Sequence, residues 1–162
     1  MSKPFPEGAS RVQEFLISKY SKSKVQILPE STATAQEAAI ALGVELYQIG
    51  KSIVLGNEYN TIVAVICGDK KVDINHLSKE LSISNLKPLK ADEVKRKTDF
   101  VIGGVSPFSL SPEILIIVDS RLFNLSACYV AAGHPKAVVK TSGREIAALT
   151  NSKILPICNQ SI

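Results

Sequence analysis

The sequence predicts a single compact α+β domain with a mixed, mostly antiparallel and barrel-like sheet flanked by helices. Two patterns indicate this fold class: helical and strand segments do not alternate strictly, and at least one β-hairpin is present. With 162 residues, 45% hydrophobic and 21% charged, the chain is long enough for one hydrophobic core. It contains no repeat, low-complexity segment or linker, so we expect one domain over residues 1–162. Neither G-x-G-x-x-G nor a P-loop is present, which argues against a doubly wound nucleotide-binding fold.

The first third is expected to form two helices and a short strand. Apolar residues recur at helical spacing over residues 10–20, and a strand is expected over residues 25–28. The next helix begins at Thr34, because Glu37 three residues later completes a capping box. It ends at Gly43, a typical residue just beyond a helix C-terminus.

The middle of the chain is expected to begin with a β-hairpin, whose strands cover residues 49–55 and 61–67. Asp73 and Asp92 each precede a stretch with helical spacing, and we expect them to cap two short helices. The apolar segment 100–102 is expected to be a strand that leads into a pair of glycines.

The last third is expected to supply the most buried strand. Residues 114–118 are continuously apolar and rich in β-branched side chains, which is typical of a strand covered on both faces. Two further strands, over residues 128–132 and 137–140, are joined by Gly-His-Pro. Ser142 with Glu145 is expected to cap a final helix.

The charge and the cysteines narrow the function classes. The net charge of +4 suits an anionic partner. The first residues have no apolar signal region and no run reaches the roughly 18 residues of a membrane span, so we expect a soluble cytoplasmic protein without a membrane partner. Cys67, Cys128 and Cys158 form no CxxC pair, so we expect buried small hydrophobes, no metal site and no cofactor.

The two histidines offer little for a catalytic triad. His76 lies on a polar helical stretch and is expected at the surface. His134 lies between Gly133 and Pro135, and its simplest interpretation is a structural residue of a tight turn. There is also no G-x-S-x-G elbow and no H-E-x-x-H motif.

Two features could contribute to a site. The loop from Gly103 to Phe108 combines paired glycines with Pro107, so its stiff backbone could direct N–H groups at an oxyanion; the alternative is a plain turn. Lys51 stands at the mouth of an apolar strand, where it could donate to a carbonyl or phosphate; the alternative is a solvated lysine.

Taken together, several segments resemble the YbaK and prolyl-tRNA-synthetase editing-domain family of aminoacyl-tRNA deacylases. The resemblance covers residues 29–149 and rests on Ser31-Thr-Ala-Thr-Ala-Gln-Glu-Ala-Ala, Leu42-Gly-Val, Ile49-Gly-Lys-Ser-Ile-Val, Gly68-Asp, Val72-Asp, Leu77, Gly103-Gly-Val-Ser-Pro-Phe, Asp119, Leu122 and Ala131-Ala-Gly-His-Pro. The sequence departs from the family at Ser109, where relatives often have glycine, and at His134, where they are variable or basic.

The resemblance implies a compact editing domain with a pocket for an aminoacyl ester, no metal and no covalent nucleophile. The catalytic residues that it implies are Lys51, Gly103, Gly104, Val105, Ser106 and Pro107. The substrate-binding residues expected beside them are Thr34, Ser52, Phe108, Gly133 and His134. Contacts with tRNA are expected from Lys95, Lys97, Lys136 and Lys140, although each is equally compatible with a solvated face.

The function that follows from the resemblance is trans-editing: hydrolysis of a mischarged small amino acid of the alanine, cysteine or serine class from tRNA, with tRNA(Pro) as the expected acceptor. Assistance by the vicinal ribose hydroxyl would explain why the sequence offers no acid–base pair. Prolyl-tRNA synthetase is a partner that the resemblance suggests. The alternatives are a non-catalytic aminoacyl- or nucleotide-binding module associated with a synthetase, and a hydrolase acting on a small-molecule ester or phosphate.

Overall fold

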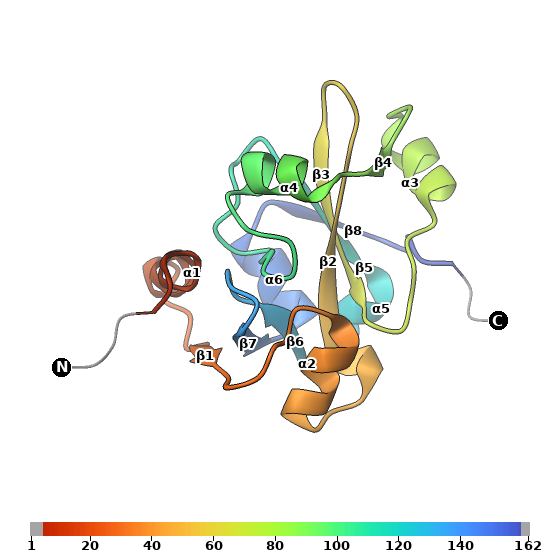
Figure 1. Cartoon of the computed structure of the whole chain (residues 1–162). Coiled ribbons are helices and arrows are strands. Elements are labelled where there is room, and N and C mark those ends of the chain that lie inside the picture. The colour runs from red at the N-terminus through yellow and green to blue at the C-terminus, as the bar shows by residue number, and fades with distance from the viewer. Residues whose placement is uncertain (1–4, 160–162) are drawn as a thin grey trace.

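The structure, a computed structural model, describes residues 5–159 and has the mixed α+β architecture expected from the sequence (Figure 1). Its elements, in chain order, are α1 (Glu7–Ser18), β1 (Val25–Ile27), α2 (Ala35–Leu42), the 3-10 helix η1 (Leu46–Gln48), β2 (Ile49–Gly56), β3 (Thr61–Cys67), α3 (Ile74–Leu81), β4 (Lys87–Pro88), α4 (Ala91–Thr98), β5 (Leu115–Asp119), α5 (Ser120–Phe123), β6 (Cys128–Ala131), β7 (Ala137–Thr141), α6 (Gly143–Leu149) and β8 (Ser152–Leu155).

The strands form one open sheet in the order β1-β7-β6-β2-β3-β5-β8, and β4 pairs with part of β2. The β1–β7, β6–β7, β2–β3 and β2–β4 pairs are antiparallel, whereas β2–β6, β3–β5 and β5–β8 are parallel. Within residues 5–159, β1 and β8 remain the two ends of the sheet, so the barrel-like closure expected from the sequence is not formed. The mixed character of the sheet is confirmed.

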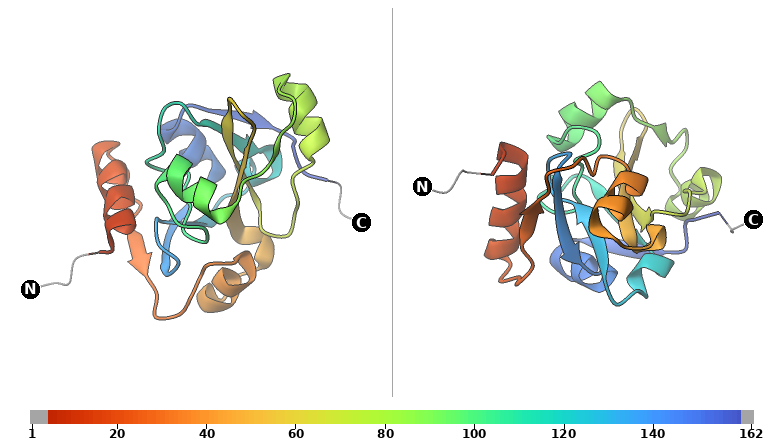
Figure 2. Two further views of the ribbon diagram at one scale, coloured as in Figure 1. Left: turned by 45° about the horizontal axis from the view of Figure 1, so that its top comes forward. Right: turned by 60° about the horizontal axis from the view of Figure 1, so that its bottom comes forward.

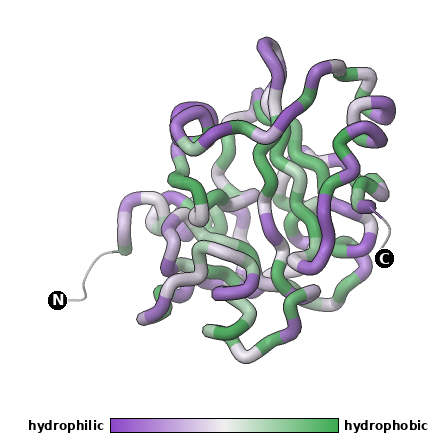
Figure 3. Tube along the Cα trace, turned by 45° about the vertical axis from the view of Figure 1, so that its right-hand side comes forward, coloured by the Kyte–Doolittle hydropathy of each residue, from purple (hydrophilic) through white to green (hydrophobic). Residues whose placement is uncertain are grey.

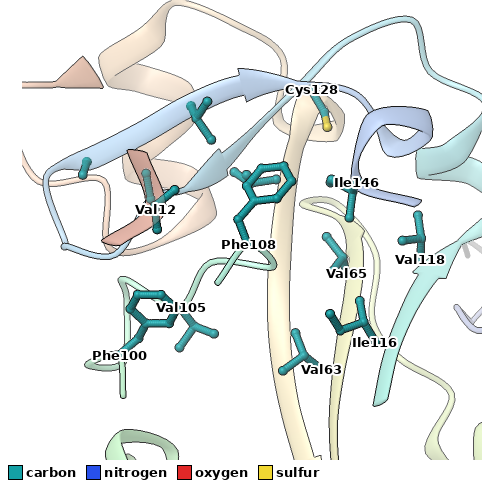
Figure 4. Packing of buried hydrophobic residues seen from close by; sticks show 14 of the residues in the cluster. Val12, Val63, Val65, Phe100, Val105, Phe108, Ile116, Val118, Cys128 and Ile146 are labelled. Atoms are coloured by element: carbon teal, nitrogen blue, oxygen red, sulfur yellow. The ribbon is translucent and has the colours of Figure 1, made fainter. Parts of the chain in front are cut away.

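Hydrophobic residues run along the central strands (Figure 3), and their side chains form a cluster on each face of the sheet. One face carries the larger cluster, in which Val63 and Val65 of β3 and Ile116 of β5 pack beneath Phe108 and Ile146 (Figure 4). The opposite face carries a second cluster around Ile66, Leu77 and Ile117. Because β3 and β5 are buried on both faces, their sequences are continuous apolar runs, as expected for such strands.

Helix α1 lies beside β1 at the edge of the domain (Figure 2) and is held by an unusually close backbone contact. A Cβ atom at Gly8 would overlap the carbonyl oxygen of Gly133, and one at Gly133 would overlap the backbone of Gly8. This approach brings Val12 and Leu16 into the main cluster, where both are fully buried.

Most of the expected elements are present, with the capping residues that the sequence indicated. The capping box of Thr34 and Glu37 forms, and Gly43 ends α2 in the left-handed conformation. Asp73 caps α3 and Ser142 caps α6. The hairpin of β2 and β3 pairs in register from Gly50↔Cys67 to Gly56↔Thr61.

Two expectations were wrong. Segment 100–102 is not a strand, because the Gly104 N–H donates to the Val101 carbonyl (2.9 Å) and closes a turn. Asp92 does not cap α4; Lys90 occupies the N-cap and Asp92 lies in the first turn, where its charge complements the helix dipole. The sequence analysis also missed β4, α5 and β8, each of which has four residues or fewer.

We predict that Gly8→Ala destabilises the domain by about 1–3 kcal/mol, the usual cost of forcing extra atoms into a packed contact. The exposed Glu14→Ala on the same helix is the matched control and should change the unfolding free energy little. Urea unfolding measures both variants. A Gly8→Ala protein as stable as Glu14→Ala would show that α1 shifts away from Gly133 at no cost.

Candidate functional site

A cavity of ≈ 340 Å³ opens beside the middle of β2, and its walls come from six parts of the chain. The floor is β2 from Ile49 to Val54, one wall is the segment from Thr32 to Ala38, and the opposite wall includes Gly103 and Val105. The strands β6 and β7 and the β4–α4 segment complete the lining, with residues Tyr129, Val130, Ala131, Val138, Pro88, Leu89 and Val94.

The cavity exists because pairing along the outer edge of β2 is interrupted. On that edge β6 pairs with Ile49 and Gly50, and β4 pairs with Leu55 and Gly56. Between them, the Val54 carbonyl accepts from the Leu89 N–H (3.0 Å). Lys51 to Ile53 pair with β3 on the inner side, but no strand of the described chain pairs with them on this outer edge. The edge of the sheet is therefore open at the middle of β2.

Lys51 is the one charged residue among those that line the cavity within residues 5–159. Its Nζ donates to the carbonyl oxygen of Gly68 at 3.1 Å, which fixes the end of the side chain and leaves two further N–H donors. Burial lowers the pKa of Lys51 below its usual value, an effect partly offset by Cys158 and Asp69. Lys51 is therefore not a solvated lysine at a strand end, which was the alternative interpretation of the sequence.

The Gly103–Val105 loop touches the opposite wall of the cavity. Gly103 has φ 85°, a conformation that favours glycine, and a Cβ there would lie 2.9 Å from the Cβ of Ala33. The Gly104 N–H is used in the turn to Val101. By contrast, the N–H groups of Gly103 and Val105 have no hydrogen-bond partner among the residues that the structure describes. Both residues line the cavity, so their two unpaired amides are candidates for contact with a ligand.

Gly104 packs against the turn that contains His134 rather than against the cavity. A Cβ at Gly104 would lie 2.9 Å from the backbone nitrogen of His134, and the Gly104 carbonyl accepts from the Gly133 N–H (2.9 Å). The His134 Nδ1 accepts from the Lys136 N–H (3.0 Å), so the imidazole stabilises its own turn. Gly133 and His134 do not line the cavity.

The remaining residues of the loop are buried away from the cavity. The Ser106 hydroxyl is fully buried and accepts from the Phe108 N–H at 3.2 Å. Phe108 packs on Phe15 with ring centroids 5.9 Å apart, and Pro107 lines a separate hollow with Phe15. Ser109 has φ 68°, a left-handed conformation that favours glycine.

Thr34 and Ser52 line the cavity, as expected of substrate-binding residues. The Thr34 hydroxyl is already used, because it accepts from the Glu37 N–H at 3.1 Å. The Ser52 hydroxyl is buried and has no hydrogen-bond partner in the part of the chain that the structure describes. The other lining residues, such as Ala33, Val94 and Tyr129, could not be identified from the sequence, because small or apolar side chains resemble any core residue.

The four expected tRNA-binding lysines are all exposed, on two separate segments. Lys95 and Lys97 lie in the last turn of α4, whose Val94 lines the cavity. Lys136 and Lys140 lie at either end of β7, whose Val138 lines it as well. His76 is partly exposed beside Glu80 (3.8 Å), and of the cysteines Cys67 and Cys128 are buried and Cys158 is half-buried.

Metal ligands and membrane helices were also sought in residues 5–159. No group of three or more histidine, cysteine, aspartate or glutamate side chains is arranged to hold a metal ion there. None of the helices in this range has the length and hydrophobicity required to cross a membrane.

Known proteins match this chain over most of its length. It is 28% identical to the uncharacterized protein YwhH of Bacillus subtilis (79% of this chain, 82% of YwhH). It is 27% identical to EbsC of Enterococcus faecalis (79% of each chain), which is provisionally named a Cys-tRNA(Pro)/Cys-tRNA(Cys) deacylase. A crystal structure provisionally described as a trans-editing enzyme for prolyl-tRNA synthetase superposes with a TM-score of 0.86 at 30% identity, covering 97% of this chain and all of that one.

The model of the aminoacyl-tRNA editing domain matches residues 29–149, which include every residue that lines the cavity. The Lys51 strand, the Gly103 loop and every strand except β1 and β8 lie within this range. The chain therefore belongs to the aminoacyl-tRNA editing domain family.

Proposed function

We propose that this protein is an aminoacyl-tRNA deacylase that acts in trans on a mischarged small amino acid, alanine, cysteine or serine, with tRNA(Pro) as the acceptor. The observation that carries the proposal is the cavity itself, a largely apolar space lined by Lys51, Gly103 and Val105, of which the two loop residues have N–H groups without a partner in the described chain. A tRNA substrate would place the protein in the cytoplasm, and prolyl-tRNA synthetase is a partner compatible with the activity.

The reaction adds the oxygen of a water molecule to the ester carbonyl carbon and breaks the bond to the ribose oxygen, which leaves with a proton. The Gly103 and Val105 amides would stabilise the negative charge that develops on the carbonyl oxygen. Lys51 would hold that carbonyl or the terminal phosphate of the tRNA. The vicinal ribose hydroxyl would assist proton transfer, so the scheme needs neither a metal nor a covalent nucleophile.

The lining of the cavity favours a small, uncharged amino acid. Alanine and valine side chains dominate the walls, and Lys51 would repel a basic side chain. A hydrophobic pocket distinguishes one methylene by only about 1–3 kcal/mol, which is why a separate editing site is useful after synthesis. A non-catalytic binding module would hold the same substrate without turning it over.

We predict that the purified protein hydrolyses at least one of alanyl-, cysteinyl- and seryl-tRNA(Pro) faster than prolyl-tRNA(Pro), with EDTA present. Lys51→Ala and the length-matched Lys51→Met should each lower the rate by about 10²-fold or more, since a charged donor to the reacting group is lost. Acid-gel analysis of the charged tRNA measures the rates.

Both Lys51 variants should fold. Burial lowers the pKa of Lys51, which means that the folded protein pays a desolvation cost for this cation, and a neutral side chain removes that cost. Binding without turnover by the wild type would favour the binding module. Wild-type rates in folded Lys51→Met would remove Lys51 from the mechanism.

We predict opposite behaviour for two loop variants. Gly103→Ala forces a side chain into a left-handed conformation against Ala33, so it should slow single-turnover hydrolysis at least about tenfold. Ser106→Ala leaves the Phe108 N–H without its partner, so it should lower stability by about 1–3 kcal/mol but keep most of the activity. An inactive but folded Ser106→Ala would indicate a nucleophilic serine instead.

We predict that tRNA binding weakens as salt rises and that α4 contributes to it. Lys95→Glu with Lys97→Glu should weaken binding of tRNA but leave hydrolysis of a minimal aminoacyl-adenosine unchanged. Lys22→Glu with Lys24→Glu makes the same charge change on exposed residues that do not adjoin the cavity. Equal losses in the two double variants would mean that only net charge matters.

A further inference from the structure

Ser52 has main-chain groups that face the open edge of the sheet. The Ile49 carbonyl accepts from the Gly68 N–H (2.7 Å), so Ile49 directs its hydrogen-bonding groups toward the β3 side. Successive residues of a strand alternate in this respect, so Gly50, Ser52 and Val54 direct theirs to the outer edge. The bond from the Leu89 N–H to the Val54 carbonyl (3.0 Å) agrees with this assignment.

Both main-chain groups of Ser52 are left unpaired within the described chain. The parallel ladder with β6 stops at Gly50↔Val130, and the antiparallel ladder with β4 begins at Leu55↔Pro88. An unpaired N–H and C=O of one strand residue point in the same direction and form a template for another strand. Here that template is the floor of the cavity, so a ligand has to satisfy it.

An aminoacyl group carries the complementary pair of hydrogen-bonding groups. Its α-ammonium is a donor and its ester carbonyl is an acceptor, and in an extended conformation both point to one side, as in a strand residue. We propose that the aminoacyl group of the substrate binds as a single added strand residue opposite Ser52. This inference rests on the proposed function, and it assigns the contact that recognises the α-amino group.

In this arrangement the Ser52 carbonyl accepts from the α-ammonium and the Ser52 N–H donates to the ester carbonyl. The ester carbonyl then lies toward the Lys51 end of Ser52, because the N–H precedes the side chain along β2. The Ser52 N–H acts on the same oxygen as the free loop amides. It thus adds a donor to the stabilisation of the developing oxyanion.

The position of the substrate side chain follows from the same pairing. Directly paired residues of antiparallel strands project their side chains to the same face of the sheet. Ser52 shares its face with Val54, which belongs to the cluster that includes Val94, Val105 and Val130. These valines therefore limit the size of the amino acid.

The test separates the main chain of Ser52 from its side chain. Ser52→Ala removes only the side-chain hydroxyl, which has no partner within residues 5–159, and serves as the reference against which the loss of the N–H is measured. Ser52→Pro also removes the N–H, and it should lower the rate by about 10²-fold relative to Ser52→Ala. Proline is tolerated on an unpaired strand edge, and Ser52 makes no main-chain bond to β3. Thermal unfolding checks that both variants fold.

A second measurement needs no variant. The wild type is titrated with 3′-(L-alanylamino)-3′-deoxyadenosine and with the 3′-propionylamino compound, which lacks the amino group, while the backbone amide resonances are followed by NMR. The alanylamino compound should bind at least about tenfold more tightly and should shift and protect the Ser52 amide.

The proposal is overturned if folded Ser52→Pro is as active as Ser52→Ala. It is equally overturned if both compounds bind alike or leave the Ser52 amide unchanged. These results differ from failure of the proposed function, in which the wild type hydrolyses none of the three mischarged tRNAs.

Discussion

The interrupted pairing along the outer edge of β2 is the constraint on which the candidate site depends. If β6 continued beside β2 beyond Gly50, or if β4 began before Leu55, hydrogen bonds of the sheet would close the edge and occupy the cavity floor. Unpaired backbone groups are costly when buried and prone to pairing when exposed. In this fold they lie between the end of the β6 ladder and the start of the β4 ladder, at the edge of the cavity.

Close contacts through small residues hold the two sides of the opening in place. The loop glycine Gly103 lies against Ala33, another residue of the cavity wall, and Gly104 rests on the backbone of His134. The same turn meets α1 through Gly133 and Gly8. A chain of backbone contacts thus runs from the cavity wall to the first helix, and α1 is fixed in turn by the core residues Val12 and Leu16. This chain explains how glycines outside the cavity maintain its shape.

Lys51 gives the apolar cavity its polarity. Its charge is partly buried, which lowers its pKa, but the bond to the Gly68 carbonyl compensates part of the lost hydration. A cation held in this way interacts more strongly with a carbonyl or phosphate than a solvated lysine does, since less water screens it. The neighbouring free amides add donors without adding charge, and together they suit an ester whose carbonyl becomes negative during hydrolysis.

The sequence by itself determined the fold class, the hairpin, most helix caps and, through short motifs in a fixed order, the editing-domain family. These features depend on local propensity or on residues near one another in the chain, such as Thr34 with Glu37, so a single sequence records them. Only the tertiary structure decided which loop residues meet the cavity. Ser106 and Phe108 belong to the same sequence motif as Gly103, yet their side chains point into the core, because packing against the sheet determines their orientation. Only the tertiary structure showed the open edge at Ser52. Whether a strand has a partner depends on the whole sheet and cannot be inferred from the residue type.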